Sequence, residues 1–277
     1  MIDLLDVEVR VMAFLVGACI GSFLNVCVSR WPEGLSVVAP RSRCPRCGAG
    51  IAWYDNFPIV SWLVLRARCR GCGEPISPVY PLVELVVALA WLAAAIAYGP
   101  TFSAVRVAVF VTLLLGITLT DASKYEIPDG FTVFGFGFAL VTAGIALFIN
   151  ETLPFASLYD AFMGACAGAG AIAIAGWLGE VVLKKEAMGF GDVTLMAMIG
   201  AFIGPQRALL TVFLGALLGA VVFLVVVFPI GRLKSRGSAD YEMPLVPFGV
   251  FLAPAALAAL LWGNALVDWY AHRMLGL

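Results

Sequence analysis

Residues 131–149 read FTVFGFGFALVTAGIALFI, a run without a charged side chain. A helix needs about 20 apolar residues to cross the hydrocarbon core of a bilayer, so this stretch predicts a membrane-spanning helix. Seven other stretches are also predominantly apolar, and the eight predicted spans cover residues 11–29, 82–98, 104–120, 131–149, 158–183, 188–204, 208–229 and 248–268. The sequence therefore predicts an all-α polytopic membrane protein with about eight transmembrane helices.

The composition agrees with this fold class. Of the 277 residues, 62% are hydrophobic and 13% are charged, whereas about a quarter of the residues of a soluble domain are charged. These values exclude a soluble globule, a disordered chain and a nucleic-acid binder. The opening MIDLLDVEVR is acidic, whereas a secretory signal begins with a basic segment. The first span is therefore expected to be a retained helix.

The orientation follows from the basic residues, because short cytoplasmic loops are enriched in Lys and Arg. Most of the 17 Lys and Arg residues fall in alternate loops, starting with residues 30–81. This bias predicts that residues 30–81 lie in the cytoplasm and that both termini lie outside.

The loop of residues 30–81 contains two C-x2-C pairs, CPRCG at 44–48 and CRGCG at 69–73. This spacing is typical of a four-cysteine structural zinc site, with Cys44, Cys47, Cys69 and Cys72 as the ligands. Gly48 and Gly73 suit the tight turn after each second cysteine. Two disulfides or four free thiols are the alternatives, and the reducing cytoplasm disfavours disulfides. Such a closed zinc site would fold the loop and would perform no chemistry.

Two acidic residues are predicted to meet at the cytoplasmic ends of membrane helices. Asp121 closes the third span in TDASKYEIPDG, and Asp192 opens the sixth in MGFGDVTLM. Gly189 and Gly191 permit a local break in the helix, which is tolerated at membrane depth where a segment lines a cavity or water. Paired carboxylates that share one proton provide both a base and an acid, as in aspartic proteases.

The histidine count restricts the alternatives. His272 is the single histidine, so hydrolases that need a His-liganded zinc or a Ser/His pair are excluded. A proton-coupled transporter that uses Asp121 and Asp192 as a relay remains a second hypothesis. A membrane-anchored zinc adaptor without catalysis is a third. For Glu84, at the cytoplasmic start of the second span, helix capping and a functional role both remain open.

Two further segments indicate helix packing. GACAGAGA at residues 164–171 lies inside an apolar span, where small residues favour close helix contact. VPFGVF at residues 246–251 contains Pro and Gly and predicts a kinked start of the last span.

The loop segment SVVAPRSRCPRCGAGIAWYDNFPIVSWLVLRARCRGCGEPISPVYPLVEL, residues 36–85, closely resembles the cytoplasmic domain of bacterial type IV prepilin peptidases. DASKYEIPD and MGFGD resemble the two aspartate motifs of that family, in the same order. The resemblance implies three segments: a first helix at 1–29, a methyltransferase-associated zinc domain at 30–81, and a seven-helix aspartic peptidase domain at 82–277.

The resemblance also implies the chemistry. The family cuts the leader from type IV prepilins and type II secretion pseudopilins at the cytoplasmic side of the inner membrane. It then methylates the new N-terminal residue, usually Phe, with S-adenosylmethionine. Asp121 and Asp192 would be the catalytic pair, and Zn2+ on the four cysteines would hold the loop for methylation. Thr194 stands where relatives often have Lys. Separately, a peptidase without methyltransferase activity is an alternative. The implied partners are prepilins, pseudopilins and membrane lipid, with no nucleic acid.

Overall fold

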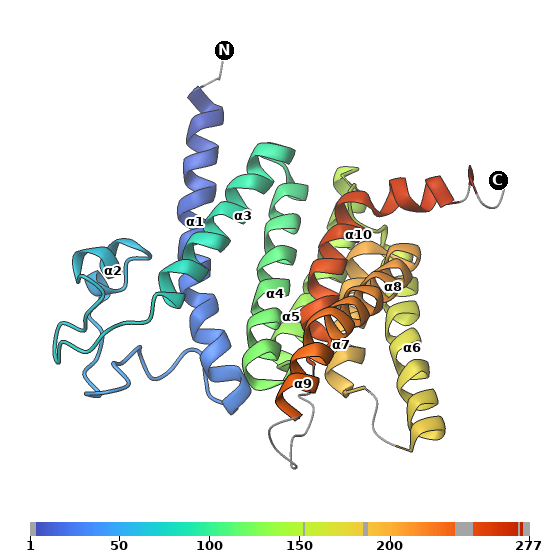
Figure 1. The fold of residues 1–277 in the computed structure, drawn as a ribbon. Helices are drawn as coiled ribbons and strands as arrows, with labels where there is room; N and C mark the ends of the chain where they lie inside the picture. The colour runs from blue at the N-terminus through green and yellow to red at the C-terminus, as the bar shows by residue number, and fades with distance from the viewer. Residues whose placement is uncertain (1–3, 152, 185–187, 236–245, 271, 274–277) are drawn as a thin grey trace. The chain divides into compact units, whose positions relative to one another are not determined.

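The computed structural model describes residues 4–151, 153–184, 188–235, 246–270 and 272–273. Within these ranges the regular elements are helices, and no strand occurs (Figure 1). The helices are α1 (Leu4–Arg30), α2 (Val60–Val64), α3 (Val79–Tyr98), α4 (Phe102–Lys124), α5 (Asp129–Ile149), α6 (Leu158–Leu183), α7 (Phe190–Ile203), α8 (Pro205–Val222), α9 (Phe228–Ser235) and α10 (Gly249–Tyr270). Short turns η1 (Trp31–Glu33) and η2 (Trp53–Asp55) lie between α1 and α2, and the π-helix η3 (Phe223–Val227) joins α8 to α9.

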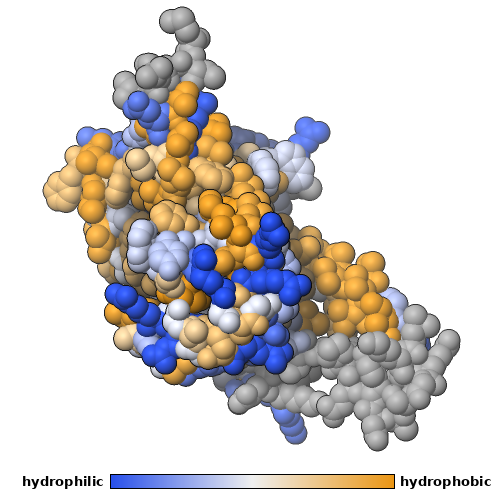
Figure 2. All heavy atoms as spheres, turned by 90° about the vertical axis from the view of Figure 1, so that its left-hand side faces the viewer, coloured by the Kyte–Doolittle hydropathy of each residue, from blue (hydrophilic) through white to orange (hydrophobic). Residues whose placement is uncertain are grey.

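Seven helices in the described part of the chain are long and apolar enough to cross a membrane. This finding confirms the prediction of an all-helical, multi-pass membrane protein. The predicted span at 188–204 corresponds to α7, which has only 14 residues. At 1.5 Å per residue it is about 21 Å long, less than the roughly 30 Å of a hydrocarbon core. Broad hydrophobic areas on the face shown in Figure 2 fit a surface in contact with lipid.

The chain forms two compact units, Met1–Gly116 and Ile117–Leu277. In the first unit, α1 packs along α3. Glycines allow this close approach, since a Cβ added to Gly17 would lie 2.8 Å from the Cβ of Trp91. The indole Nε1 of Trp91 also donates a hydrogen bond to Thr112 Oγ1 at 3.1 Å, which ties α3 to α4.

In the second unit, α7 is the buried helix and packs against α5, α6, α8 and α10. Its side chains from Met198 to Ile203 are all buried, together with Leu195 and Met196. A helix that is apolar on all sides is expected in the interior of a bundle. The short helix that carries Asp192 is therefore surrounded by longer ones.

The small residues of α6 provide its contact with α7. A Cβ on Gly164 would overlap the carbonyl of Gly200, and one on Gly168 would overlap the carbonyl of Met196. The predicted role of the GACAGAGA segment in helix packing is thus confirmed. Larger side chains at these positions would push α7 away from α6.

The end of α7 opposite Asp192 is held by a single turn and a buried arginine. Gly204 alone links α7 to α8 and has a φ of 83°, which favours glycine. Arg207 donates to the carbonyls of Ile203 and Pro154 at 2.8 and 2.6 Å. These bonds satisfy a carbonyl that the end of the helix leaves open.

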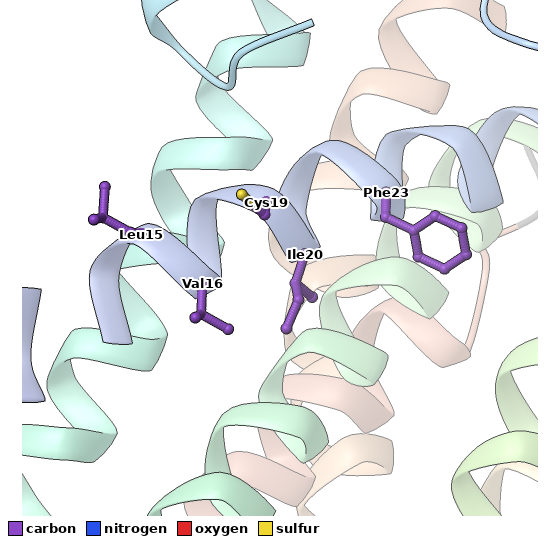
Figure 3. A pocket seen from close by; sticks show the side chains of 5 residues that line it. All are labelled: Leu15, Val16, Cys19, Ile20 and Phe23. Carbon is purple, nitrogen blue, oxygen red and sulfur yellow. The ribbon is translucent and has the colours of Figure 1, made fainter. Parts of the chain in front are cut away.

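A shallow hollow of about 410 Å³ lies on α1 (Figure 3). Its lining side chains all come from this helix and are Leu15, Val16, Cys19, Ile20 and Phe23. Apart from the Cys19 thiol, the lining side chains are hydrocarbon. The hollow fits contact with a hydrocarbon chain, as expected for a membrane helix.

Candidate active site and metal centre

The four predicted cysteine ligands meet in the loop between α1 and α3. The sulfur atoms of Cys44, Cys47, Cys69 and Cys72 all lie within 4.8 Å of one another. The Sγ atoms of Cys44 and Cys72 are 3.9 Å apart, and a tetrahedral zinc with Zn–S bonds of about 2.3 Å separates its sulfurs by about 3.8 Å. The donor set and its spacing therefore fit a zinc ion.

The two halves of the cluster have the same backbone turn. Cys44 donates its N–H to Ala49 and accepts from Gly48 N–H, both at 2.9 Å. Cys69 and Gly73 repeat this pattern, with Cys69 bonded to Glu74 at 2.8 Å and Gly73 to Cys69 at 2.9 Å. Gly48 and Gly73 have φ values of 70° and 73°. The glycines are thus needed where the sequence predicted a tight turn.

The backbone also prepares one thiol for metal binding. Hydrogen bonds from the backbone of Cys47 and Arg46 lower the pKa of Cys44 to about 6. Metals bind the thiolate, so hydrogen bonds that lower the pKa of Cys44 also favour metal binding at this sulfur. Thiolates at the other three cysteines would repel the Cys44 thiolate unless a cation balances their negative charges.

An ion pair connects the second C-x2-C pair, Cys69 and Cys72, to the aromatic turn η2. The guanidinium of Arg70 donates to both carboxylate oxygens of Asp55, at 2.7 and 2.6 Å. It also lies over the ring of Tyr54, 5.7 Å from the ring centre. The hydrogen bond from Arg70 lowers the pKa of Asp55. The loop is therefore held by polar contacts as well as by its cysteines.

In the second unit, Asp121 lies at the C-terminal end of α4 and is buried. Its carboxylate accepts backbone hydrogen bonds from Val250, at 3.1 Å, and from Gly249. Both donors belong to the first turn of α10, whose N-terminal N–H groups have no partner within the helix. The start of α10 thus orients the Asp121 carboxylate.

Asp192 is the third residue of α7, and Gly189 is the N-cap. Its carboxylate accepts a hydrogen bond from the backbone of Gly189, and its charge interacts with that of Asp121. The two carboxyl groups predicted to face each other are therefore close enough for their charges to interact. Thr194, two residues after Asp192, donates its hydroxyl to the carbonyl of Gly191 at 3.0 Å.

Ile127 lies beside the start of α7, which carries Asp192, and beside the first turn of α10, which binds Asp121. A Cβ on Gly191 would lie 3.0 Å from the Cβ of Ile127, and one on Gly249 would lie 3.2 Å from its Cδ1. The same Cβ on Gly249 would lie only 2.7 Å from Asp121 Oδ2. Hydrogen at these glycines leaves room for both the isoleucine and the carboxylate.

Sequence reasoning missed the roles of Ile127, Gly249 and Val250. The stretch at 246–251 was interpreted only as a kinked helix start, and α10 does begin at Gly249. The hydrogen bond from Val250 N–H to Asp121 joins residues 129 positions apart. No local pattern reports such a contact.

Of the two roles considered for Glu84, the structure rules out helix capping. Glu84 lies in the second turn of α3, past the N-cap Pro78, and so does not cap the helix. Its Oε2 accepts the N–H of Ile59 at 2.7 Å, and its side chain also bonds to Ser22. Glu84 therefore links the loop to two membrane helices of the first unit.

Comparison with known proteins identifies two matching domains. The bacterial peptidase A24 N-terminal domain matches residues 15–98, and the type IV leader peptidase family matches residues 108–224. The first range contains the four cysteines, and the second contains Asp121 and Asp192. No solved structure matches the chain.

Curated relatives match along most of the chain. A prepilin leader peptidase/N-methyltransferase of Myxococcus xanthus is 44% identical over 84% of this chain and 68% of its own length. The protein of that name from Aeromonas hydrophila is 35% identical over 95% of this chain and 94% of its own length. The one from Pseudomonas aeruginosa is 36% identical, with coverages of 92% and 91%.

Proposed function

Because this chain belongs to the type IV leader peptidase family, we propose that it cleaves the leader peptide of prepilins and pseudopilins and then methylates the new N-terminal amine. Asp121 and Asp192 are the catalytic pair in this proposal. The observation that carries it is their meeting in the second unit, with Asp121 held by the first turn of α10.

The pair can hydrolyse a peptide bond without a metal ion. One carboxylate takes a proton from water as the water oxygen attacks the scissile carbonyl carbon, and the protonated partner gives its proton to the carbonyl oxygen. The C–N bond of the tetrahedral intermediate then breaks. The departing amine takes a proton from the first carboxyl group, the one that had accepted it from water. The carbonyl oxygen returns its proton as the new carboxyl group forms. Two close carboxyl groups suit this exchange because one proton is readily shared between them.

We assign the methylation step to the part of the chain that includes the zinc domain, residues 30–81. Cys44, Cys47, Cys69 and Cys72 would hold a structural zinc ion that folds the loop. When bound, S-adenosylmethionine supplies an electrophilic methyl group for the amine that cleavage exposes. Methyl transfer gives a positively charged methylammonium group and leaves S-adenosylhomocysteine. The methylammonium group then releases one proton and becomes a neutral amine.

The proposed location is the bacterial inner membrane, with the N-terminus in the periplasm and the aspartates facing the cytoplasm. The distribution of Lys and Arg supports this orientation. The pairing of the end of α4 with the start of α7 is compatible with it, because both ends must then lie at the same side.

The decisive test replaces each aspartate by Asn in the full-length protein, reconstituted in lipid with a synthetic prepilin. Asp121→Asn and Asp192→Asn should each lower cleavage by at least about 10³-fold, because residues that act as one catalytic unit fail together. The control is Asp160→Asn, since Asp160 lies in the first turn of α6 and bonds to Ser157.

Methylation gives a second readout in the same experiment. Mass spectrometry of a pre-cleaved pilin with S-adenosylmethionine should show normal methylation by both Asn variants, which would demonstrate that they fold. Normal cleavage by either variant would reject that residue as catalytic. Absence of methylation by the unaltered protein would leave a peptidase without the transferase activity.

A further inference from the structure

The short helix α2 exposes its apolar side chains and buries a polar one. Val60, Leu63 and Val64 are 57%, 62% and 70% exposed. These positions follow the i, i+3, i+4 spacing of a single helix face. Ser61 is instead buried, and its hydroxyl donates to the carbonyl of Tyr54 at 3.2 Å. A loop surrounded by water would show the opposite arrangement.

A hydrogen bond ties the start of α2 to the second turn of α3, a candidate membrane helix. Ile59, the N-cap of α2, donates its N–H to Glu84 at 2.7 Å. Glu84 is 8% exposed and lies in the candidate span Val79–Tyr98, five residues from its start. At 1.5 Å per residue, this places the contact about 8 Å along the span. The apolar face of α2 is therefore close to the bilayer.

The backbone at Ile59 is strained in a way that maintains this contact. Its φ and ψ are 62° and −51°, and Val60 N–H is bonded to the Pro58 carbonyl, two residues back. This is the rare γ-turn, which is costly for a β-branched residue. The contact with the buried carboxylate of Glu84 offsets this cost.

The residues on either side of α2 suit the polar boundary of a bilayer. Before the helix, Trp53 and Phe57 are 77% and 56% exposed, with their rings 6.4 Å apart. After it, Arg66 and Arg68 are exposed. Tryptophan is enriched at the headgroup level, and Arg is attracted to anionic lipids.

We propose that α2 lies in the boundary between headgroups and acyl chains, with Val60, Leu63 and Val64 in contact with lipid. Trp53 and Phe57 lie at the headgroup level, and Arg66 and Arg68 bind the phosphates of anionic lipids. The four-cysteine cluster, which follows α2 directly through Cys69, is thereby held at the membrane surface. This inference does not depend on which residues catalyse cleavage.

The test uses a photoreactive benzoylphenylalanine in the full-length protein, in nanodiscs that contain phosphatidylglycerol. The probe replaces Leu63 or Val64, whose exposed side chains tolerate a larger group. The matched control is Val38, an 86% exposed valine of the same loop outside α2. After irradiation, mass spectrometry should detect about ten-fold more lipid adduct at Leu63 and Val64 than at Val38, as expected for a face in the acyl boundary.

The contribution of the arginines is tested by changing the lipid. The adduct at Val64 should decrease when Arg66→Ala and Arg68→Ala are combined, or when phosphatidylcholine replaces phosphatidylglycerol. Equal adduct yields at Val64 and Val38 would overturn the proposal. Cross-linking of Val64 to an added prepilin in place of lipid would also overturn it, since the face would then bind a peptide. Zinc content, measured on each variant, verifies that the loop remains folded.

Discussion

The cysteine loop and the aspartate-bearing bundle hold their reactive groups by different means. In the loop, many side chains are exposed and four sulfur atoms gather within 4.8 Å. In the unit Ile117–Leu277, Asp121 and Asp192 are fixed by the ends of helices whose packing buries α7. A loop with a small core depends on its metal, whereas a packed bundle depends on the fit of its helices. Each region should therefore fail under a treatment that the other survives.

Metal removal should have the largest effect, and it should be confined to the loop. A chelator, or the combined changes Cys44→Ser and Cys72→Ser, should release zinc and unfold residues 30–81, because structural zinc contributes about 10 kcal/mol or more of folding free energy in small domains. The measurements are zinc per chain and limited proteolysis. Methylation should decrease more than cleavage.

The control for metal removal is Cys166→Ser, which changes an exposed cysteine of α6 outside the cluster. It should retain the zinc of the unaltered protein. Equal zinc content in the Cys44→Ser, Cys72→Ser double variant would contradict the assignment of the cluster as the metal site.

The second prediction concerns the bundle and a single added methyl group. Gly249→Ala places a Cβ 2.7 Å from Asp121 Oδ2 and should displace the carboxylate. A displacement of 1 Å can lower a rate by about 10²-fold, and we expect a decrease of this size in kcat for cleavage. Zinc content and methylation of a pre-cleaved pilin should not change.

Gly144→Ala is the matched control, because a Cβ at Gly144 in α5 meets no atom within 4 Å. It should cleave normally. Full cleavage by Gly249→Ala would show that the first turn of α10 does not position Asp121.

The smallest effect is expected at the loop surface. Asp55→Asn removes the charge that pairs with Arg70 and should speed zinc loss to a chelator about two-fold at low salt, with less effect at high salt. Because Arg70 lowers the pKa of folded Asp55, the pair stabilises the loop above the unfolded pKa of about 3.9. This stabilisation is lost as the pH falls through the lower folded value, so the effect should be constant from pH 6 to 8.

Glu74→Gln provides the comparison for this prediction. Glu74 contacts Arg46 at 3.3 Å through one nitrogen, with 73% of the arginine side chain exposed. Its removal should change zinc loss even less than Asp55→Asn. A larger effect of Glu74→Gln would show that the bidentate geometry of Asp55 and Arg70 does not stabilise the loop.

The sequence predicted features that depend on local spacing or on topology. The cysteine cluster follows from two short motifs, and the meeting of Asp121 with Asp192 follows from counting spans. These predictions need only the period of a helix and the thickness of a bilayer.

Contacts between distant segments could not be predicted in this way. The hydrogen bond from Val250 to Asp121 and the one from Ile59 to Glu84 join residues 129 and 25 positions apart. In each case an ordinary backbone N–H is the donor, and every residue except proline has one. The identity of the residue therefore contains no signal for the contact.

The attachment of α7 at Gly204 connects events at opposite ends of this helix. Asp192 lies twelve residues from Gly204, a distance of about 18 Å along the axis. A tilt of 5° about Gly204 would therefore displace Asp192 by about 1.6 Å, enough to separate reacting groups. The hydrogen bonds of Arg207 to Ile203 and Pro154 restrain this pivot. The accuracy of the aspartate pair is thus determined partly at the opposite end of α7, about 18 Å from the carboxylate.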